Sequence, residues 1–553
     1  MRAVFPARAF LLVLSLLFSG PTAEAQQTPR RLLPEPPSEA ARPVARPEVS
    51  GAPAPTIRRE AIGAPSLASV GLGRPRFAFA GPLWPQAEAD RLLALLERLP
   101  ERLALPALRD LARRLLTAPG PRLDDGLALL TSRARALERI GDPGLAAELL
   151  MAPGDAESRA AREEAALLAF AAAGASRSCG LAEGLPGEQP WLVAVRIACA
   201  LREGDRALAG LRLELARERG IVFTPDFLAL VDAARVGEPL PVSLPTAAER
   251  PAVLLLIGAL PVGSPGIAGE LMADPAVLAA LARNPGAPAG IRLPAAEAAA
   301  AAGWLDAEAL RTVYLETAGT EETSDAGTRA MLVARLAAET VPAARAALLV
   351  EAEPVRAAGV ERLLWLRVLA PDAKMLVPDP ALDWAAEAVL FALLAAGETD
   401  AVAQWAELLE RRVKERGEGR AALARIERLL ALAGLRPLPE PLGIAGERQL
   451  LLFATLADAL GLSLPAADWG RLLAGEGPAG GDAPPLSLWR ESEIAAAEGR
   501  PGEGLLAALG LFGDMPASAP PLALWRALRG IVTSGEPAVA RATAVELALV
   551  WRL

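Results

Sequence analysis

The chain has 553 residues, of which 52% are hydrophobic but only 4% aromatic, and its formal net charge is −9. It contains no histidine, which excludes histidine-dependent catalytic triads, histidine zinc sites and acid–base steps that use histidine. The basic residues are scattered among acidic ones rather than gathered in a stripe, which argues against nucleic acid as a partner, because nucleic-acid-binding proteins gather positive charge on one face.

The N-terminal segment has the pattern of a secretory signal peptide. Arg2 and Arg8 precede a ten-residue apolar run over residues 9–18, and residues 23–25 (AEA) match a small-residue cleavage pattern. The apolar run is too short to cross a bilayer. We therefore predict a signal peptide at 1–25, localisation in the periplasm, and no transmembrane segment after cleavage.

A proline-rich stretch follows the predicted cleavage site. Residues 26–58 contain eight prolines and no apolar periodicity, so this part of the chain can bury little apolar surface to offset its conformational entropy. We predict that residues 26–80 form a disordered linker, with the folded part starting near Gly81. The linker is basic, so it either contacts an anionic lipid or wall polymer or simply stays solvated.

From Gly81 onward the apolar residues recur at the spacing of amphipathic helices. Leu92, Leu95 and Leu96 share one helical face, and residues 402–413 combine an apolar stripe with a charged face. Alanine and leucine favour helices, and residues that favour strands are scarce. The fold class predicted is therefore all-α.

Four segments repeat one pattern, in which an amphipathic helix is followed by a glycine, an acidic or turn residue and a second helix. These segments are residues 134–150, 195–216, 389–410 and 494–513, with Gly141, Gly204, Gly397 and Gly499 at the ends of the first helices. Asp142, Asp205 and Asp400 are placed to cap the second helices.

This turn chemistry resembles that of tetratricopeptide-type helical hairpins, although the full 34-residue pattern does not recur in register. The resemblance implies an α-solenoid of stacked helical hairpins. The composition also resembles that of Ala-rich exported proteins of proteobacteria, which implies a compartment but no activity. Breaks rich in Pro, Gly and polar residues divide the array into an N-terminal repeat region at 81–240, a middle region at 241–320 and a C-terminal repeat region at 321–553.

Cys179 and Cys199 are the only cysteines. An even count in an exported chain favours a disulfide, which would join two neighbouring helices. Two buried free thiols are the alternative.

Glu491 and Ser492 resemble the Glu-Ser pair that opens the catalytic motif of soluble lytic transglycosylases. The Gly-rich segment that follows this pair in those enzymes is missing here, and only 62 residues follow Glu491. We therefore predict no catalytic residue, no cofactor-binding residue, no metal ligand and no enzymatic activity.

Several tryptophans are spaced about 20 residues apart, namely Trp365, Trp384, Trp405, Trp469 and Trp489. They either fill the core between stacked helices, which the apolar stripe around Trp405 favours, or line a ligand groove.

Helical arrays expose long surfaces suited to binding. The function predicted is a non-enzymatic periplasmic scaffold or adaptor that binds a protein partner through its helical-repeat surface. The alternative is an accessory factor of cell-wall metabolism that binds peptidoglycan or a wall enzyme.

Overall fold

The computed structural model describes most of the chain from residue 66 onward. The described residues are 66–73, 79, 81–123, 126–153, 158–174, 176–241, 248–263, 273–319, 324–355, 359–474, 485–514 and 516–553, and they belong to one compact unit, Ala64–Leu553. The predicted signal peptide at 1–25 lies outside the described residues, as does the predicted disordered linker apart from residues 66–73 and 79.

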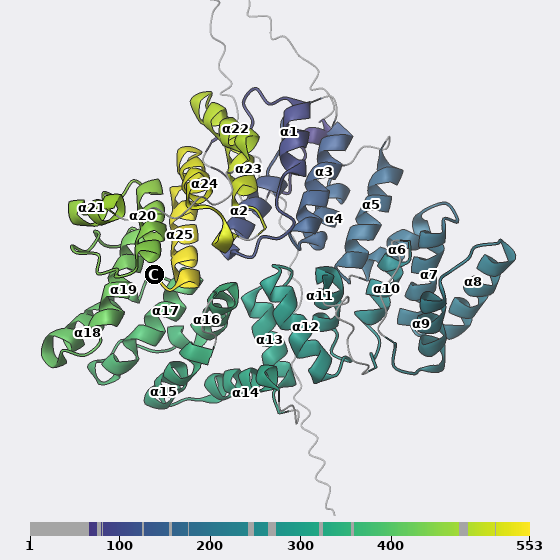
Figure 1. Ribbon diagram of the computed structural model, residues 1–553. Coiled ribbons are helices and arrows are strands. Elements are labelled where there is room, and N and C mark those ends of the chain that lie inside the picture. Colours follow the sequence, from purple (N-terminus) through teal and green to yellow (C-terminus); the bar gives the residue numbers. More distant parts are fainter. Residues whose placement is uncertain are drawn as a thin grey trace, which may run out of the picture. The chain divides into compact units, whose positions relative to one another are not determined.

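Within these ranges the fold is all-α and contains no β-strand, which confirms the predicted fold class. One isolated bridge pairs Leu240 with Val262. The helices follow one another as antiparallel neighbours in a helical-repeat arrangement (Figure 1). In chain order they are α1 (Ala89–Glu97), α2 (Pro106–Thr117), α3 (Gly126–Arg139), α4 (Pro143–Met151), α5 (Arg159–Ala172), α6 (Arg177–Gly184), α7 (Pro190–Arg202), α8 (Arg206–Glu218), α9 (Pro225–Val236), α10 (Arg250–Ile257), α11 (Pro275–Arg283), α12 (Ala289–Ala301), α13 (Ala307–Thr317), α14 (Asp325–Ala338), α15 (Pro342–Ala352), α16 (Gly359–Lys374), α17 (Ala386–Ala396), α18 (Val402–Arg416), α19 (Arg420–Leu432), α20 (Glu447–Ala459), α21 (Ala466–Ala474), α22 (Leu486–Ala497), α23 (Pro501–Phe512), α24 (Pro521–Thr533) and α25 (Pro537–Trp551).

Helix ends account for much of the proline and glycine in the sequence. Proline occupies the first turn of many helices, where its missing N–H has no intrahelical acceptor to lose. The four glycines predicted at helix C-termini all have positive φ, which confirms that prediction: 89° at Gly141, 81° at Gly204, 73° at Gly397 and 66° at Gly499.

The predicted aspartate caps are only partly present. Asp205 accepts a hydrogen bond from the Leu208 nitrogen at 2.8 Å and caps α8. Asp142 precedes α4 but makes no cap bond, because Arg113 Nη2 donates to its carboxylate instead, at 3.0 Å. Asp400 was also predicted wrongly, since α18 starts one residue further on and its N-cap position is Ala401.

Arginine side chains bind the backbone carbonyl groups at the C-terminal ends of helices. Guanidinium groups donate to backbone carbonyls at or just beyond helix C-termini, where those carbonyls have no intrahelical donor. Arg162 donates to Leu150 O at the end of α4, at 2.9 Å. Arg367 donates to Ala395 O at the end of α17, also at 2.9 Å. A planar fork with five donors can satisfy several carbonyls at once, which lysine cannot do, and the chain has only two lysines.

The packed structure begins before Gly81, so the predicted linker boundary at residue 80 is too late. A short 3-10 helix, η1 (Leu67–Ser69), lies against α3, and Ala68 is fully buried. The buried Arg133 holds this segment by donating to Val70 O at 2.8 Å and to Leu116 O at 2.9 Å. A Cβ added to Gly120 would lie 2.1 Å from the carbonyl oxygen of Ala68, so glycine at this position lets the two backbone segments lie close together.

The last helix packs against the first ones. α25 contacts α2 and also α16, α17 and α19, while α23 contacts α1 and α2 (Figure 1). Arg114 Nη1 on α2 is 2.9 Å from a carboxylate oxygen of Glu536, which precedes α25. The helical path therefore closes on itself, whereas the first and last repeats of an open solenoid touch only their neighbours.

In the described part of the chain, no helix combines the length and the apolar character needed to cross a membrane.

Candidate functional site

Three turns from distant parts of the chain meet at one place. A Cβ added to Gly141 after α3 would lie 2.8 Å from the carbonyl oxygen of Gly303, which follows α12. A Cβ added to Gly303 would in turn lie 2.8 Å from the carbonyl oxygen of Leu103. Arg109 Nη1 donates to Gly303 O at 2.7 Å and fixes the contact. Both glycines have positive φ and no room for a side chain, so this junction requires glycine at both positions.

A cleft of about 690 Å³ opens beside this junction. Its walls come from α3, α5, α10, the start of α11 and the loop before α2, and its lining mixes charged with apolar side chains. The lining residues are Glu101, Arg102, Glu138, Arg139, Leu168, Ala172, Arg250, Pro251, Leu254, Ala273, Asp274, Pro275, Ala276 and Trp304. Clefts of this size and mixed lining are typical of ligand sites.

Glu138 is the chemically unusual residue in this cleft. Its carboxylate receives no hydrogen bond from any residue that the structure describes. Burial raises its pKa to about 7, and the positive charges of Arg135 and Arg250 only partly oppose this shift. A carboxyl group with such a pKa changes its charge near neutral pH.

Two arginines of the cleft, Arg250 and Arg139, each have at least one acceptor, while the buried Nε atom of each has no partner among the described residues. Arg250 Nη2 lies 2.8 Å from Asp274 Oδ1, and the same oxygen caps α11 by accepting from the Ala276 nitrogen at 2.9 Å. Arg139 Nη2 donates to Leu96 O at the end of α1, at 2.5 Å. These guanidinium groups are therefore held in place and shape the wall around Glu138.

The rim of the cleft is fixed by the C-terminal part of the chain. The backbone nitrogens of Glu101 and Arg102 donate to Asp514 Oδ1 at 2.6 and 3.2 Å. The side chains of Glu101 and Arg102 are exposed to solvent. The closure of the helical path thus positions one edge of the cleft.

Trp304 supplies the aromatic wall. It directly follows Gly303, and a Cβ on Gly141 would lie 3.0 Å from its Cγ atom. Trp304 and Glu138, which lies on the last turn of α3, both line the cleft.

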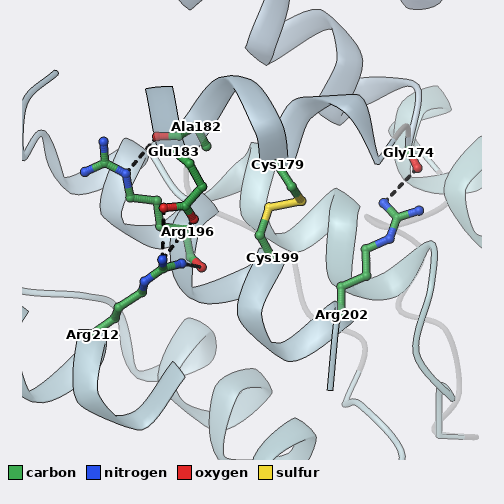
Figure 2. The surroundings of a disulfide bond; sticks show 8 residues. All are labelled: Gly174, Cys179, Ala182, Glu183, Arg196, Cys199, Arg202 and Arg212. Carbon is green, nitrogen blue, oxygen red and sulfur yellow. Dashed lines mark hydrogen bonds and ion pairs between the residues drawn. A yellow bond between two sulfur atoms is a disulfide. The ribbon is translucent and has the colours of Figure 1, made fainter. Parts of the chain in front are cut away.

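The two cysteines predicted to pair lie elsewhere and are joined. A disulfide links Cys179 on α6 to Cys199 on α7, with the Cα atoms 5.6 Å apart (Figure 2). Both cysteines are buried. Arg196 on α7 donates to Ala182 O near the end of α6 at 2.8 Å, so a second contact ties the same two helices together (Figure 2).

Glu491 of the Glu-Ser pair belongs to an ion-pair cluster around the buried Arg500. Glu491 Oε1 lies 3.0 Å from Nη1 of Arg500, which is buried and also contacts the buried Glu503. Ser492 is 1% exposed and packs close to Gly530. This arrangement gives Glu491 a structural partner and places Ser492 out of reach of a large substrate.

The five tryptophans singled out in the sequence have different environments. Trp365 and Trp405 are buried, as expected of core residues, whereas Trp384 is 36% exposed and Trp469 is 42% exposed. Trp489 stacks on Trp525, with the ring centroids 6.4 Å apart. None of the five lines the large cleft, so the regular spacing did not mark a groove there.

Sequence reasoning missed the two residues that give the cleft its chemistry, Glu138 and Trp304. One signal was present for Glu138: it lies four residues after Ala134, a buried residue of α3, so an acid flanks the apolar face of that helix. Trp304 had no such signal, because its role depends on a contact between turns 162 residues apart.

Among the described residues, no group of three or more His, Cys, Asp or Glu side chains could hold a metal ion. Compared with known proteins, the chain matches no family model, no curated protein and no solved structure. The resemblance to tetratricopeptide-type hairpins therefore stays a prediction.

Proposed function

We propose that this chain is a non-catalytic binding protein of the periplasm that holds a segment of a partner protein in the cleft beside the Gly141–Gly303 junction. The observation that carries the proposal is the cleft itself. It is large enough for several residues of an extended peptide, and two of its charged groups are held in place, Arg250 by an ion pair with Asp274 and Arg139 by a backbone carbonyl. Fixed polar groups in an apolar frame favour specific binding, because less side-chain entropy is lost when the ligand arrives.

Two features support the periplasmic location. The N-terminal segment carries a signal-peptide pattern, and the two cysteines are positioned as a bonded pair. Disulfides persist in oxidising compartments and are rare in the reducing cytosol.

The test is a crosslinking pull-down from intact periplasm with the full chain and a variant whose cleft is filled. Ala172→Trp places an indole in the cleft from α5. Leu211→Trp is the matched control, because Leu211 is 57% exposed on α8 and lies outside the cleft. We expect a partner that wild type and Leu211→Trp capture and Ala172→Trp does not. Equal capture by all three would refute the cleft as the binding site.

A second candidate is an accessory factor of cell-wall metabolism. The exposed indoles of Trp384 and Trp469 favour it, because the apolar faces of sugar rings pack on exposed aromatic rings. Sedimentation with purified sacculi tests this candidate. Loss of sedimentation in a variant with Trp384→Ala and Trp469→Ala, but not in Ala172→Trp, would favour wall polymer over the protein partner.

A further inference from the structure

A second pocket lies apart from the cleft, where the last helix meets the middle of the chain. It has a volume of about 250 Å³ and shares no lining residue with the cleft. Its walls come mainly from α16, α17, α19 and α25, and α25 contacts each of the other three helices (Figure 1). Pockets for drug-sized ligands measure roughly 300–1,000 Å³, so this pocket suits a small molecule better than a peptide segment.

Three arginines line this pocket. Arg362 on α16 is 3% exposed, Arg425 belongs to α19, and Arg552 directly follows α25. The guanidinium carbons of Arg362 and Arg425 lie 5.0 and 5.9 Å from the ring centroid of Phe391 on α17. An aromatic ring attracts cations at these distances, so Phe391 helps to hold both guanidinium groups beside the pocket.

Two of the three arginines have a carboxylate partner. Arg362 Nη2 lies 2.5 Å from Glu353 Oε1, and Arg425 pairs with Glu387. The guanidinium group of Arg552 has no hydrogen-bond or ion-pair partner among the described residues. Burial lowers the pKa of Arg362, Glu353 opposes this shift, and the nearby positive charges of Arg552 and Arg425 lower the pKa further. The pocket therefore holds one cation more than its carboxylate side chains neutralise.

We propose that this pocket binds a small organic monocarboxylate, with Arg552 as its counter-ion and with further N–H donors from Arg362 and Arg425. The two oxygens of a carboxylate match the planar fork of a guanidinium group. A guanidinium group has five N–H donors, so each ion pair leaves donors unused on Arg362 and Arg425. The site adds a small ligand to the proposed function and does not depend on it.

The organic part of the ligand should be apolar. Phe391, Leu429 and Leu549 line the pocket together with the arginines. A short hydrocarbon chain can pack on these three side chains while its carboxylate meets Arg552, and the burial of its apolar surface favours binding.

A phosphate dianion fits the pocket less well than a monocarboxylate. It brings two negative charges, whereas only Arg552 among the three arginines is unpaired. The second charge would face Glu353 and Glu387 without a counter-ion, and like charges repel strongly at a partly buried site.

The experiment is isothermal titration calorimetry of the full chain at pH 8 and constant ionic strength with four ligands. These are 4-methylpentanoate, the uncharged 4-methylpentanamide of nearly the same shape, acetate and inorganic phosphate. The amide tests the need for a charge, acetate tests the need for an apolar part, and phosphate tests the preference for a single charge.

We expect 4-methylpentanoate to bind about tenfold more tightly than each of the other three ligands. Arg552→Gln should weaken this binding by about tenfold. Glutamine keeps the Cβ atom, so the positive φ of 59° at this position disfavours both residues alike. Arg541→Gln is the matched control, because Arg541 is exposed on α25 and lies outside the pocket, and it should leave the affinity unchanged.

The proposal would be overturned by any of several results. Binding of the amide as tightly as the acid would leave an apolar pocket without anion recognition. Equal binding of acetate would indicate a site for a bare anion, and tighter binding of phosphate a multiply charged ligand. Equal losses of affinity in Arg541→Gln and Arg552→Gln, or binding of none of the four ligands, would reject the site. The pull-down with Ala172→Trp tests the cleft separately, because the two share no residue.

Discussion

The carboxylate of Glu546 caps the first turn of a helix that lies 439 positions earlier in the chain: both of its oxygens are 3.1 Å from the backbone nitrogen of Ala107. Negative charge at a helix N-terminus is favourable, because the first N–H groups lack intrahelical acceptors and the helix dipole is positive there. Arg367 Nη1 on α16 approaches the same carboxylate at 3.4 Å. One buried acid thus connects the first, middle and last parts of the helical path.

The Glu546 contact predicts a dependence of stability on pH. Burial raises the pKa of Glu546 from 4.5 to about 7. Between these values the folded chain binds a proton that the unfolded chain does not, so this group lowers the free energy of unfolding as the pH rises from about 4.5 to 7. Glu546→Gln removes the titration and keeps an acceptor for Ala107. Relative to wild type, the variant should therefore gain about 3 kcal/mol between pH 4.5 and pH 8, measured by urea unfolding. A constant difference between the two proteins would contradict this.

Closure of the helical path predicts that removing the last helix weakens the first ones. A chain that stops at Glu536 lacks α25 and exposes the apolar surfaces that α25 covers on α2 and α16. Backbone amides of α2 should then exchange with deuterium faster than in the full chain, as measured by mass spectrometry. In an open array the effect would be confined to the preceding helix, α24, so unchanged exchange in α2 would argue against the closure.

Arg133 should be irreplaceable by lysine. Its guanidinium is buried and donates only to carbonyl oxygens, of Leu116, Ala118, Ala68 and Val70. A lysine ammonium cannot reach this set, so Arg133→Lys should lower the free energy of unfolding by about 3 kcal/mol. Arg135→Lys is the matched control, because Arg135 is exposed on the same helix, and it should change stability little. Equal effects of the two substitutions would show that the carbonyl contacts contribute nothing.

The disulfide should contribute to stability. Cys179 and Cys199 close a short loop, which restricts the unfolded chain and stabilises the folded one by about 3 kcal/mol. Peptide mapping without reductant should recover the two cysteines in one cross-linked species. Replacing both by alanine should increase amide exchange mainly in α6 and α7. Free alkylation of both thiols in folded protein purified without reductant would disprove the bond.

Glu491→Gln should cost stability and leave the function of the chain unchanged. The substitution removes one of the anions around the buried Arg500 and should lower the free energy of unfolding by about 1 kcal/mol. Glu498→Gln is the control, because Glu498 contacts the same guanidinium at 2.9 Å from an exposed position and should cost less. Hydrolysis of purified sacculi by the wild type that disappears in Glu491→Gln, with an unchanged circular dichroism spectrum, would instead identify a catalytic acid.

The local features of the fold could be predicted from the sequence, because they depend on residues within one or two helical turns. Gly141 and Gly204 are recognisable at helix ends since only glycine adopts their backbone conformation readily. The apolar stripe around Trp405 likewise depends on residues within a few helical turns, and it identified α18 as a helix with one buried face.

The cap of Asp142 failed as a prediction for a different reason. Arg113, which lies on another helix, competes for the carboxylate of Asp142, and no local sequence pattern indicates that competition. The contact between Ala107 and Glu546 and the meeting of Gly141 with Gly303 are non-local in the same sense. The candidate cleft is built from these contacts, so it could not be predicted from periodicity or spacing.

The contact between the last helix and the second also limits how this protein can change in size. An open array grows or shrinks by duplication or loss of a repeat at either end, since each new unit needs only one neighbour. Here α25 already contacts α2, so neither of these helices is free to receive a further repeat. An added hairpin within the array would separate Glu546 from Ala107 or Asp514 from the rim of the cleft. We therefore expect that variation in chain length is tolerated in the connections between helices, while the number of helices between α2 and α25 stays constant.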